Sequence, residues 1–153
     1  MRLRFVWPGK TRDAHLRALL GSYLERLKHF VVCEINELPE AKFSGKKAGI
    51  DIDSRRISDA LRSATVAVLL EEKGKQWSSR ELASQLQRWA NNGIKEIAFV
   101  VGGPNGVSEL LASRADEHWS LSRLTLTHEM ARVLLLEQLY RAYTINKGIP
   151  YQK

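Results

Sequence analysis

Two loops of this chain combine the residue types that bind a small molecule at the edge of a parallel sheet. The loop 102–106, with the sequence Gly-Gly-Pro-Asn-Gly, follows the apolar run 99–101. The loop 120–127 is rich in hydroxyl groups and leads into a long apolar helix. Glycine lets backbone approach a ligand closely because no Cβ intervenes. Ligands of open α/β sheets bind at the carboxyl ends of strands, so the two loops are predicted to form two walls of one pocket.

Each loop also has a simpler interpretation. The segment 102–106 is sufficient as a turn, because it matches neither the G-x-G-x-x-G fingerprint of dinucleotide sites nor the Gly-Lys-Ser/Thr end of a phosphate-binding loop. The hydroxyls of Ser122, Thr125 and Thr127 are all good helix N-caps, and a helix needs only one. The pocket is favoured because the glycine turn lies between an apolar strand and a helix, and the second loop follows closely.

The sequence predicts neither a metal site nor a covalent nucleophile. His128 and Glu129 begin an H-E-x-x-H pattern, but Arg132 stands where the second histidine should be, and Glu137 alone does not complete a site. Cys33 lies in an apolar strand and is expected to be an inert thiol. His128, in the first turn of a helix, is expected to be structural or to stay neutral there.

Strands alternate with helices along the chain, which predicts a single α/β domain over 1–153 with a mostly parallel sheet flanked by helices. Asp51 or Asp53 is the expected cap of the second helix, and Ser78 with Glu81 forms an expected capping box. Residues 40–50 are predicted to be a mobile basic loop, and 71–75 a polar turn. The expected strands are 2–7, 30–38, 65–70, 94–101 and 119–121, and the expected helices 12–29, 51–63, 78–91, 106–115 and 127–143.

The composition favours a polyanionic partner. The formal net charge is +7, which indicates nucleic acid or else a basic but passive surface. Apolar runs fall short of the roughly 20 residues that span a bilayer, so no membrane association is expected. The single cysteine cannot form an internal disulfide, which favours a reducing cytoplasm.

The C-terminal part of the chain offers further alternatives. The helix 128–143 is apolar on more than one side, which is typical of a central core helix or of half a subunit interface. The basic and partly aromatic C-terminus is either a solvated tail or an RNA contact, in which Tyr151 stacks on a base and the cations hold phosphate.

Several of these segments together resemble a known family. The segments 99–106 (FVVGGPNG), 119–128 (WSLSRLTLTH), 132–142 (RVLLLEQLYRA) and 150–151 (PY) are similar to the large-subunit ribosomal RNA methyltransferase H family of the SPOUT superfamily. The resemblance implies a C-terminal trefoil knot, a homodimer and S-adenosylmethionine as cofactor. It also implies the substrate, a pseudouridine in a hairpin loop of 23S rRNA that is methylated at N3 in the assembled 70S ribosome.

The resemblance also assigns roles to residues. Arg141 is expected to hold phosphate or the base carbonyl and to stabilise developing negative charge, and Tyr151 to stack on or orient the base, which makes these two the catalytic candidates. RNA binding is assigned to Arg141, Tyr151, Gln152 and Lys153. The implied cofactor residues are Leu70, Glu71, Gly102, Gly103, Leu121, Ser122, Arg123, Leu124, Thr125, Leu126 and Thr127.

One residue departs from the family pattern. The family tail reads Tyr-His followed by a basic residue, whereas this chain has Gln152 after Tyr151. Glutamine cannot act as a general base at neutral pH, so either another group removes the proton, water with Arg141 suffices, the reaction is slower in this member, or activity is lost. Three hypotheses follow: the methyltransferase, an RNA- or ribosome-binding protein of the same fold without activity, and an unrelated α/β enzyme that binds a nucleotide at this edge.

Overall fold

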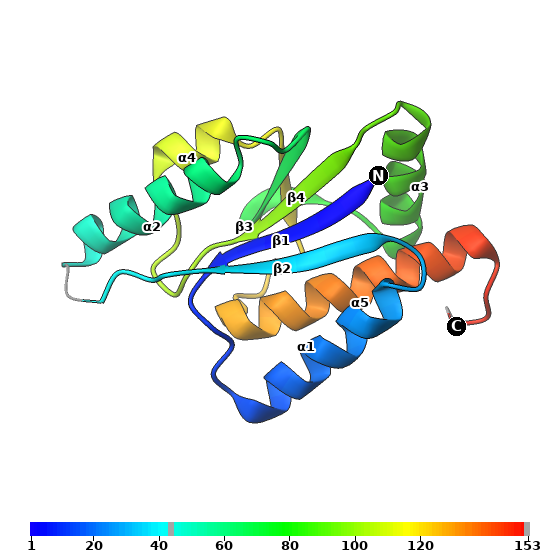
Figure 1. The fold of residues 1–153 in the computed structure, drawn as a ribbon, viewed down its shortest axis with the longest axis horizontal. Coiled ribbons are helices and arrows are strands. Elements are labelled where there is room, and N and C mark those ends of the chain that lie inside the picture. The colour runs from blue at the N-terminus through cyan, green and yellow to red at the C-terminus, as the bar shows by residue number, and fades with distance from the viewer. Residues whose placement is uncertain (43–44, 152–153) are drawn as a thin grey trace.

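The computed structural model describes residues 1–42 and 45–151, which form an α/β layered structure (Figure 1). Within these ranges the sheet has the strand order β2-β1-β4-β3-β5, and neighbouring strands run parallel. The strands are β1 (Arg2–Pro8), β2 (Val32–Leu38), β3 (Val66–Gln76), β4 (Glu96–Val101) and β5 (Glu117–Ser120). The predicted parallel α/β architecture is confirmed.

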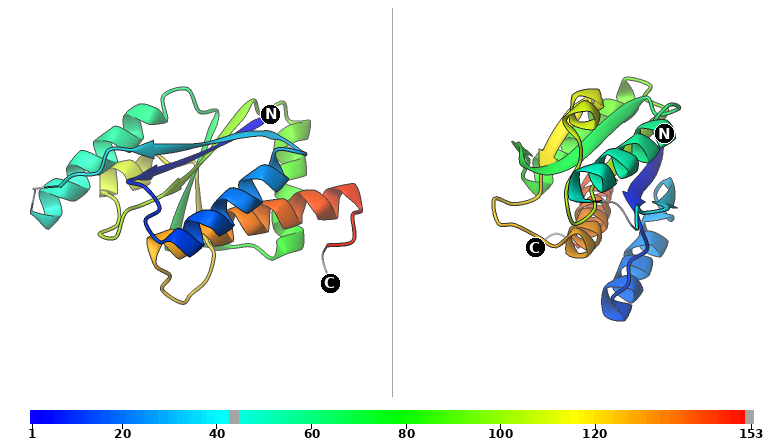
Figure 2. Two further views of the ribbon diagram at one scale, coloured as in Figure 1. Left: turned by 60° about the horizontal axis from the view of Figure 1, so that its bottom comes forward. Right: turned by 90° about the vertical axis from the view of Figure 1, so that its left-hand side faces the viewer.

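Helices cover both faces of the sheet (Figure 2). Helices α1 (Ala14–Leu27), α3 (Ser79–Asn91) and α5 (His128–Lys147) share one apolar cluster with Phe5, Phe99 and other strand residues. Helices α2 (Lys46–Ala60) and α4 (Glu109–Arg114) share a second cluster with Val6, Val100 and their neighbours on the other face. Because side chains alternate along a strand, β1 and β4 contribute to both clusters.

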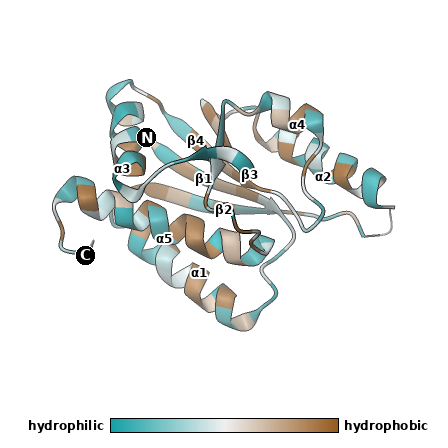
Figure 3. Ribbon diagram, turned by 180° about the vertical axis from the view of Figure 1, so that it is seen from behind, coloured by the Kyte–Doolittle hydropathy of each residue, from teal (hydrophilic) through white to brown (hydrophobic). Residues whose placement is uncertain are grey.

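The central strands are apolar throughout because helices cover both of their faces. Every residue of β4 is buried, as is every residue of β1 after Arg2. Figure 3 shows long brown stretches in the strands and in α5, whereas α2 and α3 alternate brown with teal. Helix α5 packs against both α1 and α3, so it is the central helix of its layer. Among residues 1–42 and 45–151, no helix has the length and apolar character needed to cross a membrane.

The prediction for residues 40–63 is wrong in two respects. Helix α2 begins at Lys46, inside the segment predicted to be a mobile loop, and its N-cap is Gly45. Asp51 and Asp53 therefore lie within the helix and cap nothing. Asp53 instead accepts a hydrogen bond from the backbone N–H of Ala41 at 2.8 Å. This long-range contact replaces the local cap that the sequence suggested.

The predicted turn at 71–75 is also wrong, because β3 continues to Gln76. Its pairing with β5 shifts from Leu70 opposite Trp119 to Lys75 opposite Trp119, so the residues between form a bulge. Gly74 permits the closest approach: a Cβ there would lie 2.7 Å from backbone atoms of His118 and Trp119. A bulge accommodates the polar, glycine-containing sequence that resembles a turn.

Two other predicted capping signals are confirmed. Ser78 and Glu81 form the predicted capping box at the start of α3. Thr127 is the N-cap of α5, and its side chain accepts a hydrogen bond from the Met130 N–H. Helix α5 extends to Lys147, beyond the predicted end, and stops at Gly148 in the left-handed conformation (φ 68°). The hydroxyl of Thr125 is therefore not needed for capping.

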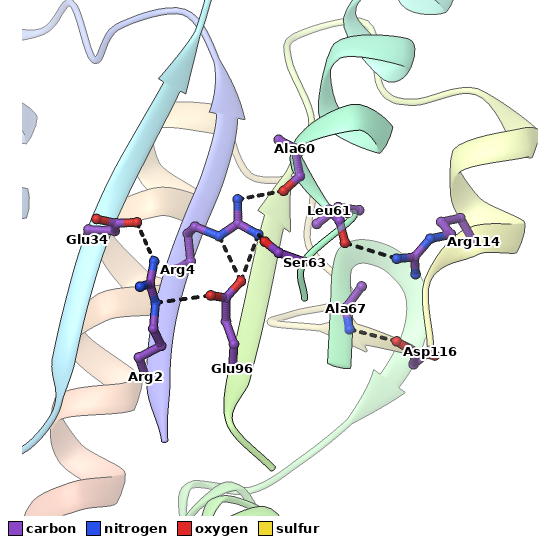
Figure 4. A network of polar contacts seen from close by, with 10 residues as sticks. All are labelled: Arg2, Arg4, Glu34, Ala60, Leu61, Ser63, Ala67, Glu96, Arg114 and Asp116. Carbon is purple, nitrogen blue, oxygen red and sulfur yellow. Dashed lines mark hydrogen bonds and ion pairs between the residues drawn. The ribbon is translucent and has the colours of Figure 1, made fainter. Parts of the chain in front are cut away.

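A charged network joins the amino ends of β1 and β4, at the end of the sheet opposite to the glycine turn (Figure 4). Arg4 donates through Nε and Nη2 to Glu96 Oε1 at 3.0 and 2.7 Å, and through Nη1 to the carbonyl of Ala60 at 2.5 Å. Arg2 binds the other Glu96 oxygen at 3.0 Å. The side chains of Arg4 and Glu96 are only 7% and 11% exposed, so this pair joins β1, β4 and α2 in a poorly solvated place.

We expect Glu96→Gln to lower the free energy of unfolding by about 3 kcal/mol, because it leaves the buried Arg4 charge without its counter-charge. Urea unfolding followed by circular dichroism measures the loss. The matched control is Asp59→Asn, which removes the exposed ion pair with Arg62 and should cost less than about 1 kcal/mol. Equal losses in the two variants would contradict the structural role assigned to Glu96.

Candidate active site

A pocket of about 800 Å³ opens at the carboxyl ends of β3 and β4. Three segments form its walls: the bulge of β3, the β4–α4 turn, and the β5–α5 loop with the first turn of α5. These are the two loops predicted from sequence, with the β3 segment added. The lining residues are Leu70, Glu71, Glu72, Lys73, Val101, Gly102, Gly103, Pro104, Gly106, Val107, Leu121, Ser122, Leu124, Thr125, Leu126, Thr127, His128 and Ala131.

The glycine turn lines the pocket with backbone that carries no side chain. Gly106 adopts a φ of +86°, which disfavours L side chains, and its N–H donates to the carbonyl of Gly103 at 3.0 Å. A Cβ on Gly102 would lie 3.0 Å from Val107 Cγ1, and one on Gly103 would lie 3.2 Å from Pro8 Cγ. The turn is thus tightly packed from behind, and its amides and carbonyls are held in place beside the cavity.

The hydroxyl-rich loop is ordered by its own side chains. Ser120 Oγ donates to the carbonyl of Ser122 at 2.9 Å, and Ser122 Oγ accepts from the N–H of Leu124 at 2.9 Å. Thr127 caps α5. Leu124 is 75% exposed although it lines the pocket. The loop therefore offers an apolar side chain and polar backbone at the mouth of the cavity.

The β3 bulge supplies the charged wall. Glu71 lies 2.5 Å from His118 Nδ1 through its Oε1 atom, and both side chains are about one-third exposed. Glu72 and Lys73 complete this wall. No local sequence signal marks His118, because its neighbour in space, Glu71, is far away in the sequence.

Arg132 supports the pocket from behind. It is fully buried, donates to the carbonyl of Pro8 at 2.8 Å and to Thr11 Oγ1 at 3.0 Å, and lies with its guanidinium 4.9 Å from the Trp7 ring centroid. Burial lowers the pKa of Arg132 to about 10. This arginine, at the position where a zinc motif would have histidine, fixes the loop after β1. The described residues contain no cluster of three or more His, Cys, Asp or Glu suited to a metal ion.

His128, on the pocket wall, is held in its neutral form. Burial, and then the nearby Arg132 charge, lower the pKa of His128 below its ordinary value. The unfolded chain takes up a proton at the ordinary pKa near 6.5, whereas the folded chain resists it. The stability that this histidine contributes is therefore complete above that pH and is lost as the pH falls through it.

We expect the wild-type chain to lose more stability than His128→Gln when the pH is lowered from about 7.5 to about 5.5. The reason is that glutamine takes up no proton in either state. Urea unfolding at both pH values measures the difference. A wild-type loss no greater than that of His128→Gln would contradict the depressed pKa.

The structure brings together all the predicted cofactor residues except Arg123, which lies on the exposed tip of the loop and does not line the cavity. The cofactor role of these residues stays a prediction.

The two catalytic candidates lie elsewhere in the protomer. Arg141 follows His128 by thirteen residues on α5, which places it about 20 Å further along the helix axis. Tyr151 packs beside it: the Arg141 guanidinium lies 4.7 Å from the Tyr151 ring centroid. Gln152 and Lys153 lie outside the described residues. The predicted residues thus form two groups, one at each end of α5.

Glu137 organises the second group and was missed as a functional candidate. It accepts hydrogen bonds from Arg141 Nε at 3.1 Å and from Tyr151 Oη at 3.1 Å. This contact raises the pKa of Arg141, and burial together with hydrogen bonds to Tyr23 and Glu137 raises that of Tyr151. The spacing of Glu137 and Arg141 by four residues on a helix was the available sequence signal.

Tyr151 is not part of a freely solvated tail. Its ring makes an edge contact with Tyr140 at 4.8 Å between centroids, and its hydroxyl lies 3.4 Å from that of Tyr23. The interpretation of this residue as a frayed terminus is therefore wrong. The aromatic contacts with α1 and α5 hold it in place.

Comparisons with known proteins find relatives that match nearly the whole chain. A family model described as "Predicted SPOUT methyltransferase" matches residues 1–152. Two relatives named "Ribosomal RNA large subunit methyltransferase H" are similar over their full lengths. The one from Christiangramia forsetii is 38% identical, covering 99% of this chain and 98% of the relative. The one from Anaeromyxobacter sp. is also 38% identical, covering 100% of both chains.

Solved structures share the fold at low sequence identity. A probable methyltransferase from Bordetella pertussis has a TM-score of 0.60 at 18% identity, covering 93% of this chain and 96% of that one. A putative methyltransferase from Legionella pneumophila, described as a complex with the bound cofactor SAM, has a TM-score of 0.55 at 13% identity, covering 93% of this chain and 66% of that one.

Proposed function

The chain belongs to the SPOUT methyltransferase family, and we propose that it transfers a methyl group from S-adenosylmethionine to N3 of a pseudouridine in a hairpin loop of 23S rRNA within the assembled 70S ribosome. The observation that carries the proposal is the pocket at the glycine turn, on a chain whose full-length relatives are named as ribosomal RNA large subunit methyltransferases. The net charge of +7 fits a polyanionic substrate.

The pocket suits the proposed cofactor. Its volume of about 800 Å³ lies within the range of small-molecule sites, about 300–1,000 Å³. The amides and carbonyls of Gly102 and Gly103 are suited to hold polar groups, and a Cβ at either position would crowd Val107 or Pro8. Glu71 and Glu72 outweigh Lys73 on the third wall, which favours a cationic ligand such as a sulfonium.

The reaction requires placement more than covalent catalysis. When bound, S-adenosylmethionine supplies an activated methyl group with its own leaving group, so the protein needs no nucleophile. The pocket must hold the base in line with that group, and such alignment can account for about 7–11 kcal/mol of a barrier. A water molecule takes up the N3 proton as the methyl group is transferred, and Arg141 neutralises the negative charge that develops on the base. Tyr151 orients the base, and its hydroxyl is held in place by the hydrogen bond that it donates to Glu137.

The separation of the two groups on α5 favours a shared site. Within one protomer, Arg141 and the pocket lie about 20 Å apart along the helix, which is too far for one nucleotide to meet both. We therefore propose a homodimer in which the pocket of one protomer faces Arg141 and Tyr151 of its partner. Sedimentation velocity at micromolar concentration should give a dimer, and a monomer would contradict the shared site.

Three further expectations remain proposals. Residues 1–153 form one domain, the C-terminal part is a trefoil knot, and the protein works on ribosomes in the cytoplasm. The knot is supported by the family match, since the family resemblance implies it.

The alternative is a catalytically impaired protein of the same fold that still binds RNA or the ribosome. Gln152 motivates it, because the family pattern has histidine there. This alternative predicts binding of cofactor and ribosomes without methyl transfer.

Methyl transfer from labelled S-adenosylmethionine tests the proposal directly. The substrates are 70S ribosomes, free 50S subunits and naked 23S rRNA from cells that lack the modification. Label in one pseudouridine of the 70S particles is the expected result. Cofactor binding without label on any substrate would favour the impaired alternative, and Gln152→His would then be the variant to assay.

A further inference from the structure

We infer that an exposed groove on the outer face of α3 binds the sugar-phosphate strand that flanks the target nucleotide. The inference rests on the proposed function, since it extends the RNA contact beyond the pocket. The groove has a volume of about 390 Å³. It is lined by Lys75, Trp77, Arg80, Glu81, Ser84 and Arg88.

The cations of the groove form a row. Arg80, Ser84 and Arg88 are spaced by four residues, so they lie on one side of α3. All three are exposed, whereas Leu82 and Leu86 on the other side are buried in the core. The two arginines lie about 12 Å apart along the helix axis. A row of this length can follow a phosphate chain rather than hold a single anion.

Trp77 provides a firmly supported aromatic surface at one end of the row. Its ring packs edge-on against Trp89, with 6.2 Å between ring centroids, and in a tilted arrangement against Trp119, with 5.4 Å between centroids. The residue remains partly exposed, and Lys75 Nζ lies 6.0 Å from its ring centroid. Aromatic rings on which bases stack, placed beside cations that hold phosphate, are typical of single-stranded RNA sites.

The acidic residue of the groove does not oppose this assignment. Glu81 is engaged in the capping box, where its Oε2 accepts the Ser78 N–H at 2.7 Å. Among the groove-lining residues, the cations Lys75, Arg80 and Arg88 outnumber this one carboxylate. The Trp77 ring favours RNA over an acidic protein segment, which offers no bases to stack.

The groove adjoins the proposed active site through β3. Lys73 lines the pocket, and Lys75, two residues further along the bulge, lines the groove. A strand whose target nucleotide enters the pocket can therefore continue over the bulge onto α3. Because the pocket and the groove are continuous, we expect the groove to bind the same RNA rather than a separate ligand.

The test compares two doubly neutralised variants. Arg80→Gln/Arg88→Gln removes the row, and the matched control Lys28→Gln/Arg62→Gln removes two exposed cations at the ends of α1 and α2. Both lower the net charge equally. Fluorescence anisotropy with a labelled single-stranded oligouridylate, over a salt series and without cofactor, reports binding. The groove variant should reduce the slope of log affinity against log salt by about 1.4, and the control should leave it unchanged.

Three outcomes would overturn the inference. They are equal slopes for the groove variant and the wild-type chain, an equal reduction in the control, and binding of polyglutamate that is as strong and as sensitive to the groove variant. In the methylation assay, the groove variant should raise KM for the ribosome and leave kcat and cofactor affinity unchanged. If the wild-type chain transfers no methyl group but the slopes differ as expected, the groove stands and the proposed activity fails.

Discussion

Arg141→Met is expected to lower kcat for methyl transfer by about 10²- to 10³-fold, because it removes the charge that stabilises the deprotonating base. Cofactor affinity should not change, since the loops that line the pocket are proposed to hold the cofactor, whereas Arg141 is proposed to contact the base. Single-turnover methylation of 70S ribosomes and equilibrium binding of S-adenosylmethionine measure the two effects. The matched control is Arg55→Met, at an exposed arginine on α2, which should keep full kcat. A kcat within about threefold of wild type in Arg141→Met would remove Arg141 from the reaction.

Mixing variants tests where Arg141 acts. Gly102→Val is expected to abolish cofactor binding, because even a Cβ there would lie 3.0 Å from Val107 Cγ1. If each site combines the pocket of one protomer with the tail of its partner, a mixed dimer of Gly102→Val and Arg141→Met contains one intact site. Random exchange of subunits should then restore about a quarter of the wild-type activity. No restoration, with mixed dimers shown to form, would place both groups in one protomer.

Gly74→Ala is expected to be among the most damaging substitutions to stability, with a loss of about 3 kcal/mol. Its Cβ would lie 2.7 Å from backbone atoms of His118 and Trp119. Paired backbone cannot relieve this clash by a rotamer change, as a side chain can. The β3–β5 pairing must open, and the wall formed by Glu71 and Lys73 moves with it. Cofactor affinity should therefore fall together with the free energy of unfolding.

The control for this prediction is Gly21→Ala on α1. Nothing lies within 4 Å of a Cβ built there, and alanine is the better helix former. This variant should gain about 0.5–1 kcal/mol. Thermal and urea unfolding of both variants check the pair of predictions. A stability loss in Gly74→Ala no larger than about 1 kcal/mol would show that the bulge tolerates a side chain.

The shared site that we propose would give a physical reason for the length of α5. The helix carries the pocket at its first turn and the Glu137, Arg141 and Tyr151 group near its other end. Arg132 and Thr127 fix the first end by contacts to the loop after β1 and by capping. A rigid helix of this kind holds both groups in fixed positions, which favours the precise placement that methyl transfer needs.

The residues by themselves predict the α/β class, the capping box at Ser78, and the pocket between the glycine turn and the loop 120–127. These features depend on signals that are local in the chain: the period of apolar residues, hydroxyl caps, and glycine where side chains do not fit. The family resemblance extended this to Leu70 and Glu71, which also line the pocket.

In three segments, long-range contacts set the conformation, and the sequence does not reveal those contacts. Residues 71–75 look like a turn and become a bulge because β5 pairs with both sides of it. Asp53 looks like a cap and instead binds the backbone of Ala41. Tyr151 looks like a loose tail and instead packs on Tyr140 and binds Glu137. In each case the deciding contact joins residues distant in the sequence, and its free energy outweighs the local preference on which a sequence prediction depends.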